Sequence, residues 1–213
     1  MRKLLLVLLI LSVRCEAQNF ELGLNAGCNF HFKPVNNIYT TQDKAIAGYA
    51  VGFKADLLLS EFQVGVGVDV ENFSQYNYLM PDYTTKVYNY LAKPLITPYA
   101  FLNKTFAVSQ GYLYAGLMGG PAIARIGINS WQYNNGPYGN PTGYTTAYYS
   151  ASGYMGGLQG GGVFHLNKVC ALNFEAGLRY CNYNYKSPTT KLEDPYHYRV
   201  FYIPLTLGLR YLI

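Results

Sequence analysis

The chain has 213 residues, a length that suits a single all-β domain, and only 13% of them are charged. An average soluble domain has about 25% charged residues. The net charge of +5 is too weak a positive balance to indicate a nucleic-acid partner. Beyond the N-terminus no apolar run approaches the roughly 20 residues that a membrane helix needs. Low charge, 23 tyrosines and 22 glycines therefore favour a membrane β-barrel over a soluble sandwich.

The first 17 residues have the pattern of a secretory signal peptide. Arg2 and Lys3 precede a short apolar run at residues 4–11, and Ala17 closes a small-residue cleavage motif. We expect Sec-type export, cleavage near Ala17 and a mature domain at residues 18–213. Cleavage removes three basic residues and one acidic residue, which leaves a net charge of +3. The three remaining cysteines are odd in number and lack metal-type spacing, so they predict neither a disulfide framework nor a metal site.

Alternation of apolar with small or polar residues predicts eight strands in the mature chain. In chain order they cover residues 20–30, 47–59, 62–71, 88–102, 111–124, 152–166, 170–183 and 200–213. The third is the clearest, with valines at every second position from Val64 to Val70. A two-residue turn at Ser60 and Glu61 would bring the apolar sets of the second and third strands to the same face.

The predicted connections alternate between long and short. The long ones are residues 31–46, 72–87, 126–151 and 184–199, and the short ones are 60–61, 103–110 and 167–169. In outer-membrane barrels the periplasmic turns are short and the extracellular loops are long. The sequence therefore predicts an eight-stranded, up-and-down antiparallel transmembrane β-barrel with both chain ends on the periplasmic side.

The apolar set of each strand is expected to face outward. A soluble barrel would bury that set and show mainly glycine and alanine to water, whereas soluble surfaces carry roughly 25–35% charged residues. On the strand at 88–102 the side chains expected to face outward are Leu91, Leu95, Thr97, Tyr99 and Phe101. Aromatic residues near the two ends of the outward sets predict girdles at the lipid headgroups: Phe20, Phe62, Phe164 and Tyr211 at one end, Phe30, Tyr49, Tyr180 and Phe201 at the other.

Three segments carry a family resemblance. Residues 202–211 (YIPLTLGLRY), 93–95 (KPL) and 112–117 (YLYAGL) resemble strands of the PorT-like and OmpA/OmpX-like eight-stranded outer-membrane β-barrel proteins. The resemblance covers the mature chain, although this chain ends on Ile213 where similar barrels end on an aromatic residue. It implies a porin-like shape and a place in the outer membrane of a Gram-negative cell envelope. Outer-membrane lipid and the barrel-assembly machinery, which would bind the C-terminal strand, are the implied partners.

Eight charged residues fall in the inward phase of the predicted strands: Glu21, Lys54, Asp56, Asp69, Glu71, Glu175, Arg179 and Arg210. They could form a polar pathway or an acid–base site. However, eight strands leave an interior only wide enough for side chains, and a buried charge is costly unless it is paired. We therefore expect mutually paired charges, with Lys54 diagonal to Asp69 and with Glu21 close enough to pair with Arg210 across the closing seam.

The long loops are the better functional candidate. Their aromatic residues, with one histidine, are Trp131, Tyr133, Tyr138, Tyr144, Tyr148, Tyr149 and His197. Tyrosine among small polar residues is typical of binding surfaces, here for an extracellular protein or a glycan. The alternative is that these residues only extend the hairpins.

Other functional classes also remain open. They are a narrow passive channel, a secretion-system accessory barrel and, with less support, a lipid-modifying enzyme or hydrolase that uses His197 near Glu193 and Asp194. Since no serine-nucleophile motif or metal spacing is present, we expect no catalytic residues, no metal and no cofactor.

Overall fold

The computed structural model describes residues 19–32, 46–72, 76–79, 85–133, 141–185 and 196–213, and these contain nine β-strands. The strands are β1 (Asn19–Phe32), β2 (Ile46–Leu59), β3 (Phe62–Glu71), β4 (Tyr76–Leu79), β5 (Thr85–Val108), β6 (Gly111–Tyr133), β7 (Pro141–His165), β8 (Cys170–Tyr185) and β9 (Tyr196–Leu212). No helix in this described part of the chain is long and apolar enough to cross a membrane.

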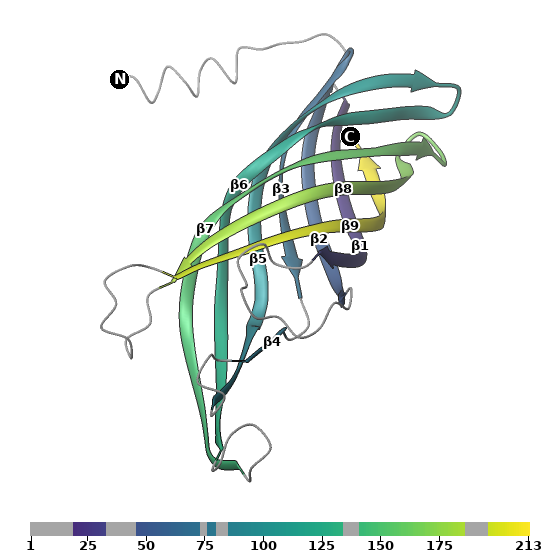
Figure 1. Ribbon diagram of the computed structural model, residues 1–213. Coiled ribbons are helices and arrows are strands. Elements are labelled where there is room, and N and C mark those ends of the chain that lie inside the picture. Colours follow the sequence, from purple (N-terminus) through teal and green to yellow (C-terminus); the bar gives the residue numbers. More distant parts are fainter. Residues whose placement is uncertain (1–18, 33–45, 73–75, 80–84, 134–140, 186–195) are drawn as a thin grey trace, which may run out of the picture.

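Eight of these strands close into an antiparallel barrel, as predicted (Figure 1). Within the ring each strand pairs with the strand before and after it, β3 pairs with β5 because β4 lies outside the ring, and β1 pairs with β9 to close it. The closing seam is long, running from Glu21 opposite Leu212 to Phe32 opposite Phe201. The ninth strand, β4, pairs with β5 beyond the ring, and sequence periodicity did not predict it.

The turns at the end of the barrel that holds the C-terminus are short. Ser60 and Glu61 join β2 to β3, with Leu59 opposite Phe62, which confirms the predicted register. Ser109 and Gln110 alone join β5 to β6, because Val108 pairs with Gly111. The predicted connection at 103–110 is therefore wrong over most of its length, and both strands are longer than expected.

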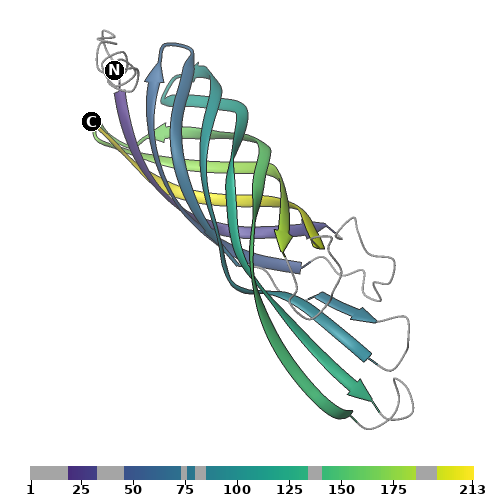
Figure 2. The same ribbon diagram turned by 90° about the vertical axis from the view of Figure 1, so that its left-hand side faces the viewer.

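At the opposite end, β5, β6 and β7 continue past the other strands (Figures 1 and 2). The predicted loop at 126–151 is wrong, because β6 reaches Tyr133 and β7 begins at Pro141, and the two remain paired along this length. With β4 and the first residues of β5 they form a four-stranded sheet, which we call the extension sheet. The predicted loops at 72–87 and 184–199 are likewise shortened by β4, β5, β8 and β9.

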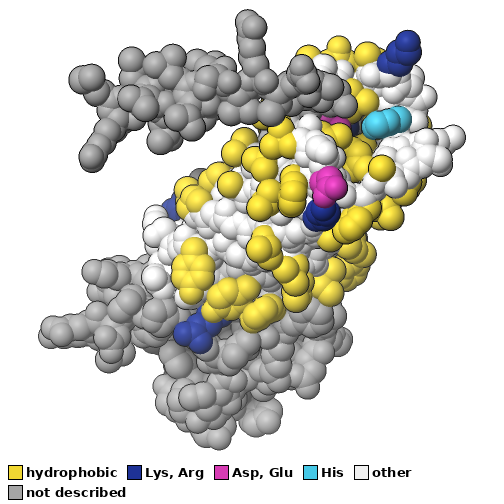
Figure 3. Space-filling model, turned by 90° about the horizontal axis from the view of Figure 1, so that it is seen from above, with side chains coloured by type: hydrophobic (Ala, Val, Ile, Leu, Met, Phe, Trp, Pro, Cys, Tyr) yellow, Lys and Arg dark blue, Asp and Glu magenta, His cyan; other side chains and the backbone are white. Residues whose placement is uncertain are grey.

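The apolar side chains face outward. Leu24, Leu117 and Leu207 are each more than 60% exposed, and Val66 is 59% exposed. Figure 3 shows hydrophobic side chains spread over the described surface on one side of the molecule, with few charged ones among them. Aromatic residues stand near both ends of this apolar band: Phe164 stacks on Phe174 at 5.8 Å between ring centroids at the short-turn end, and Tyr180 contacts Phe201 at 4.7 Å at the other end.

One strand contradicts the predicted orientation. On β5 the residues expected to face lipid, Leu95, Thr97, Tyr99 and Phe101, are buried in the interior, each 5% exposed or less. The exposed set is the even-numbered one, with Ile96 at 46% and Leu102 at 51%. The side chain of Leu91 lies outside the described residues.

Packing against β3 explains this orientation. The register places Val66 opposite Ala100 and Gly67 opposite Tyr99. A Cβ atom added to Gly67 would lie 2.5 Å from the Tyr99 ring, so the bare glycine provides the room that the inward tyrosine occupies.

Candidate functional site

The eight charged residues predicted to face inward all lie in the barrel interior, and none is more than 5% exposed. They come from β1, β2, β3, β8 and β9. The opposite wall, formed by β5, β6 and β7, contributes neutral polar side chains instead: Tyr99, Asn103, Tyr112, Tyr114 and Gln159. The interior is therefore charged on one wall and uncharged but hydrogen-bonding on the other.

The first ionic cluster surrounds Arg210. Its Nη1 atom lies 2.7 Å from Glu21 Oε2 and 3.0 Å from Asp56 Oδ2. The predicted ion pair across the closing seam is thus present. The Tyr112 hydroxyl donates a hydrogen bond of 2.6 Å to Glu21, and the Gln63 amide donates one of 2.8 Å to Asp56. Each carboxylate therefore has a neutral donor in addition to the shared guanidinium.

The second cluster surrounds Arg179. Its Nη1 atom lies 2.6 Å from Asp69 Oδ2 and 3.0 Å from Glu71 Oε1, and its Nη2 atom lies 3.7 Å from Glu175 Oε1. Lys54 pairs with Glu175. Lys54 does lie diagonal to Asp69, as predicted, since its direct partner in the ladder is Gly67. The salt bridge of its ammonium group nevertheless runs across the barrel to β8.

Tyrosine hydroxyl groups complete this second cluster. Tyr202 donates to Glu71 at 2.6 Å, Tyr114 to Glu175 at 2.8 Å and Tyr99 to Asp69 at 3.2 Å. These tyrosines were not among the interior residues predicted from the sequence. Tyr114 and Tyr202 lie in the inward phase of strands whose outward residues were correctly predicted, so their position could have been inferred. Tyr99 could not be found while the orientation of β5 was wrong.

Amide side chains join the two clusters. Gln159 Oε1 accepts a bond of 3.4 Å from Lys54, and Gln159 Nε2 donates one of 2.9 Å to Asn103. Asn103 in turn donates to Gln63 Oε1 at 2.8 Å, and Gln63 contacts Asp56 in the Arg210 cluster. Hydrogen bonds therefore run from the Arg210 guanidinium through the amides to Lys54 and Glu175, and the 3.7 Å ion pair between Glu175 and Arg179 completes the link between the two clusters. In the described part of the interior, five carboxylates face three cations, and the hydroxyl and amide donors stabilise the excess negative charge.

The residues proposed as a binding surface lie in strands. Trp131 and Tyr133 belong to β6, and Tyr144, Tyr148 and Tyr149 belong to β7. His197 belongs to β9, whereas Tyr138, Glu193 and Asp194 lie outside the described residues. Of these side chains the structure describes Tyr148, which is 52% exposed. The Arg125 guanidinium carbon lies 4.8 Å from the centroid of the Tyr148 ring.

A metal site does not emerge from the residues that the structure describes. Among them no group of three or more histidine, cysteine, aspartate and glutamate side chains could hold a metal ion. Cys28, Cys170 and Cys181 are free thiols.

Comparison with known proteins shows that this chain is similar to several solved structures in fold. No protein-family model matches the chain, and no curated protein matches its sequence. Neisserial surface protein A superposes with a TM-score of 0.47 at 12% identity, over 92% of this chain and 99% of that one. The attachment invasion locus protein of Yersinia pestis gives 0.39 at 14% identity, over 93% and 100%. Outer membrane protein W of E. coli gives 0.36 at 13% identity, over 89% and 97%.

The distribution of side chains within this structure is that of a transmembrane β-barrel. A band of apolar side chains covers the outside of the described ring, and paired charges fill the inside. In water this arrangement would expose the apolar band and bury the ions, which is the reverse of what folding in water favours. Closed barrels satisfy every backbone hydrogen bond within the ring and are the form in which strands cross a membrane.

Proposed function

We propose that this chain is an integral outer-membrane β-barrel protein that acts through its extension sheet and outer loops rather than through its lumen. The observation that carries the proposal is the contrast between the two ends of the barrel. One end closes in short turns, whereas at the other end β5, β6 and β7 project well beyond their neighbours (Figure 2). Short periplasmic turns and long extracellular hairpins are the usual arrangement in outer-membrane barrels.

The interior argues against a channel. Contacts within the Arg210 and Arg179 clusters cross the interior, with Lys54 on β2 reaching Glu175 on β8 and Tyr112 on β6 reaching Glu21 on β1. Eight-stranded barrels have an interior just wide enough to be filled by side chains. Moving these paired charges apart to admit an ion would leave buried groups without partners.

The extension sheet offers a surface to a partner. Within the described residues, β7 pairs with β8 only from Ser152 onward, so the segment 141–151 is bonded to β6 on one side alone. An unpaired strand edge can accept an extended peptide, and exposed tyrosine such as Tyr148 provides contact area at low entropic cost. An extracellular protein or a glycan is therefore the proposed ligand class.

Shortening the hairpin tests this role. Gly127 pairs with Tyr148, so joining these two positions through an Asn-Gly turn in place of residues 128–147 should keep the barrel register. We expect the shortened barrel to fold but to lose binding to glycan arrays and immobilised extracellular proteins. A second variant replaces only residues 186–195, and a third combines both changes. Retention of binding by the combined variant would refute the interaction role.

The PorT-like resemblance adds a second proposal, that the barrel-assembly machinery recognises the C-terminal strand. The last residues of β9 support it, since the aromatic Tyr211 on this strand faces outward and is 52% exposed. Changing Tyr211 to alanine should then reduce the amount of folded barrel in the outer membrane without changing synthesis, as measured by membrane fractionation.

A further inference from the structure

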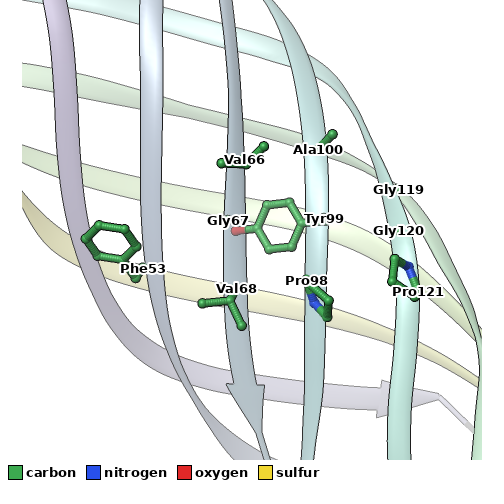
Figure 4. A pocket seen from close by; sticks show the side chains of 10 residues that line it. All are labelled: Phe53, Val66, Gly67, Val68, Pro98, Tyr99, Ala100, Gly119, Gly120 and Pro121. Atoms are coloured by element: carbon green, nitrogen blue, oxygen red, sulfur yellow. The ribbon is translucent and has the colours of Figure 1, made fainter. Parts of the chain in front are cut away.

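The lipid-facing surface carries a hollow at the middle of the barrel (Figure 4). It is an open cavity of about 520 Å³ that spans four adjacent strands, β2, β3, β5 and β6, and its lining is almost wholly apolar. The outward side chains around it are Phe53, Val66, Val68, Pro98, Ala100 and Pro121. At its floor, where β5 meets β6, the outward positions are the small residues Ala100 and Gly119, which face each other across the ladder.

Two prolines shape this floor. The β5–β6 ladder has the same register at Ile96–Ile123 and at Ala100–Gly119, which places Pro98 opposite Pro121. Proline has no backbone N–H, so neither residue can donate a ladder hydrogen bond there. At this point the outward side chains are therefore small, and the hydrogen-bond ladder between β5 and β6 is incomplete.

The hollow is not a requirement of packing. A Cβ atom added at Gly119 would meet only the carbonyl oxygen of Met155, at the ordinary contact distance of 3.4 Å. The next glycine, Gly120, is different, because a Cβ there would lie 2.8 Å from the Cα of Tyr99. Gly120 is needed for close approach of β5 to β6, whereas a larger residue would fit at Gly119.

A cation lies beyond one end of the hollow, on the same strand as Pro121. Arg125 follows Pro121 by four residues on β6, a rise of about 13 Å along the strand. Its side chain is exposed in the same outward phase, directly after Ile123, and lies over the Tyr148 ring. From Leu113 to Ile123 the outward face of β6 is apolar or small, a length that matches the apolar band of about 25 Å once strand tilt is included. Arg125 therefore lies at the level of the lipid headgroups.

We propose that the hollow and Arg125 together bind one phosphorylated membrane lipid. Its acyl chain fills the hollow and its phosphate accepts hydrogen bonds from the guanidinium, which suits the planar donor geometry of arginine. Two features favour a phosphorylated lipid as the occupant. The hollow lies at the depth of the hydrocarbon, where an acyl chain lies, and the Arg125 cation lies at the membrane interface, where it complements a negatively charged phosphate. The proposal rests on the membrane location proposed above.

The test uses purified full-length barrel reconstituted in vesicles of equal parts phosphatidylglycerol and phosphatidylcholine, followed by native mass spectrometry of the lipid that stays bound. The wild-type barrel should retain one phosphatidylglycerol in preference to phosphatidylcholine. Arg125→Gln should reduce that preference about fivefold, the effect of one cation at a membrane surface. Gly119→Leu, which fills the hollow, should reduce retention of both lipids.

Two variants serve as matched controls. Lys104→Gln removes a cation from the neighbouring strand β5 at the opposite end of the barrel, where Lys104 pairs with Glu61. Gly156→Leu adds an outward leucine next to Gly119 on the neighbouring strand, at a glycine whose Cβ would meet nothing within 4 Å. Both should retain lipid as the wild type does.

Three other outcomes would overturn the inference. Unchanged retention in Arg125→Gln and Gly119→Leu would show that neither feature binds lipid. An equal loss in Lys104→Gln would show general electrostatic attraction, and a dimer that Gly119→Leu abolishes would assign the hollow to a second copy of the chain. Flotation with vesicles and heat-dependent gel migration of each variant report separately on membrane insertion, so a failure of the proposed location would be seen directly.

Discussion

Removing the Arg179 guanidinium should destabilise the barrel strongly. In Arg179→Met an apolar side chain of similar length replaces a cation that is 1% exposed and bonds Asp69 at 2.6 Å and Glu71 at 3.0 Å. Each charge-assisted hydrogen bond contributes about 1.5–3 kcal/mol to stability. Removing one partner of a buried ion pair costs about 3–5 kcal/mol, because the other charge is left without a partner. The hydroxyl donors to both carboxylates remain in place and offset part of this loss. We expect the free energy of unfolding to fall by about 4 kcal/mol.

Urea unfolding of the barrel in phospholipid vesicles, followed by far-ultraviolet circular dichroism, measures this change. The combined variant Arg179→Met, Asp69→Asn, Glu71→Gln neutralises both orphaned carboxylates and should recover most of the loss, because packed neutral groups replace the ionic cluster. The reasoning fails if Arg179→Met alone costs less than about 1 kcal/mol, the value of an exposed pair. It also fails if neutralising Asp69 and Glu71 restores nothing.

Three further predictions follow from the same structure. Gly67→Val should cost about 1–3 kcal/mol in the same urea assay, because its Cβ would overlap the Tyr99 ring, whereas Gly119→Val should cost little. Lys104 lowers the pKa of the exposed Glu61 carboxylate, so this pair stabilises the fold at neutral pH and its contribution is lost as pH falls through the lowered pKa. In Lys104→Gln an NMR titration should show the pKa of Glu61 rising toward its ordinary value, with only a small fall in the urea midpoint, because an exposed ion pair contributes little stability. In planar bilayers the wild-type barrel should show no discrete conductance, and regular openings would contradict a lumen closed by side chains.

Alternation along the chain was sufficient to predict the barrel. Strands β1, β2, β3, β8 and β9 have one apolar and one small or polar face, so their orientation, and the inward position of all eight charges, could be inferred from sequence alone. The two-residue turn at Ser60 and Glu61 fixes the register of β2 against β3, and that register alone places Lys54 diagonal to Asp69.

The orientation of β5 could not be inferred from its own residues, because both of its faces are apolar. Leu95 and Phe101 lie in one phase and Ile96 and Leu102 in the other. Hydrophobicity therefore does not separate the two faces, and the deciding factor is the space left by glycine on β3. The short turn at Ser109 and Gln110 could have resolved the question. A register of Val108 opposite Gly111 puts Leu102 opposite Leu117, and Leu117 was correctly expected to face lipid.

The extension sheet was missed for a different reason. Beyond Arg125 on β6 and before Ala151 on β7, the strands leave the apolar band, and their sequence is rich in tyrosine, threonine, asparagine and glycine. Without a lipid-facing side there is no hydrophobic alternation to detect, and turn-rich composition then resembles a loop. The backbone pairing between β6 and β7 holds the sheet together there instead.

The distribution of charge along the chain has a consequence for how the protein enters the bilayer. Glu21, Lys54, Asp56, Asp69 and Glu71 are synthesised early, whereas Arg179 and Arg210, which neutralise four of them, come from the last two strands. An N-terminal half inserted by itself would carry mostly unmatched acids into hydrocarbon. Stepwise, hairpin-by-hairpin insertion is therefore disfavoured, and the ring is expected to assemble as a unit once its final strand has been delivered.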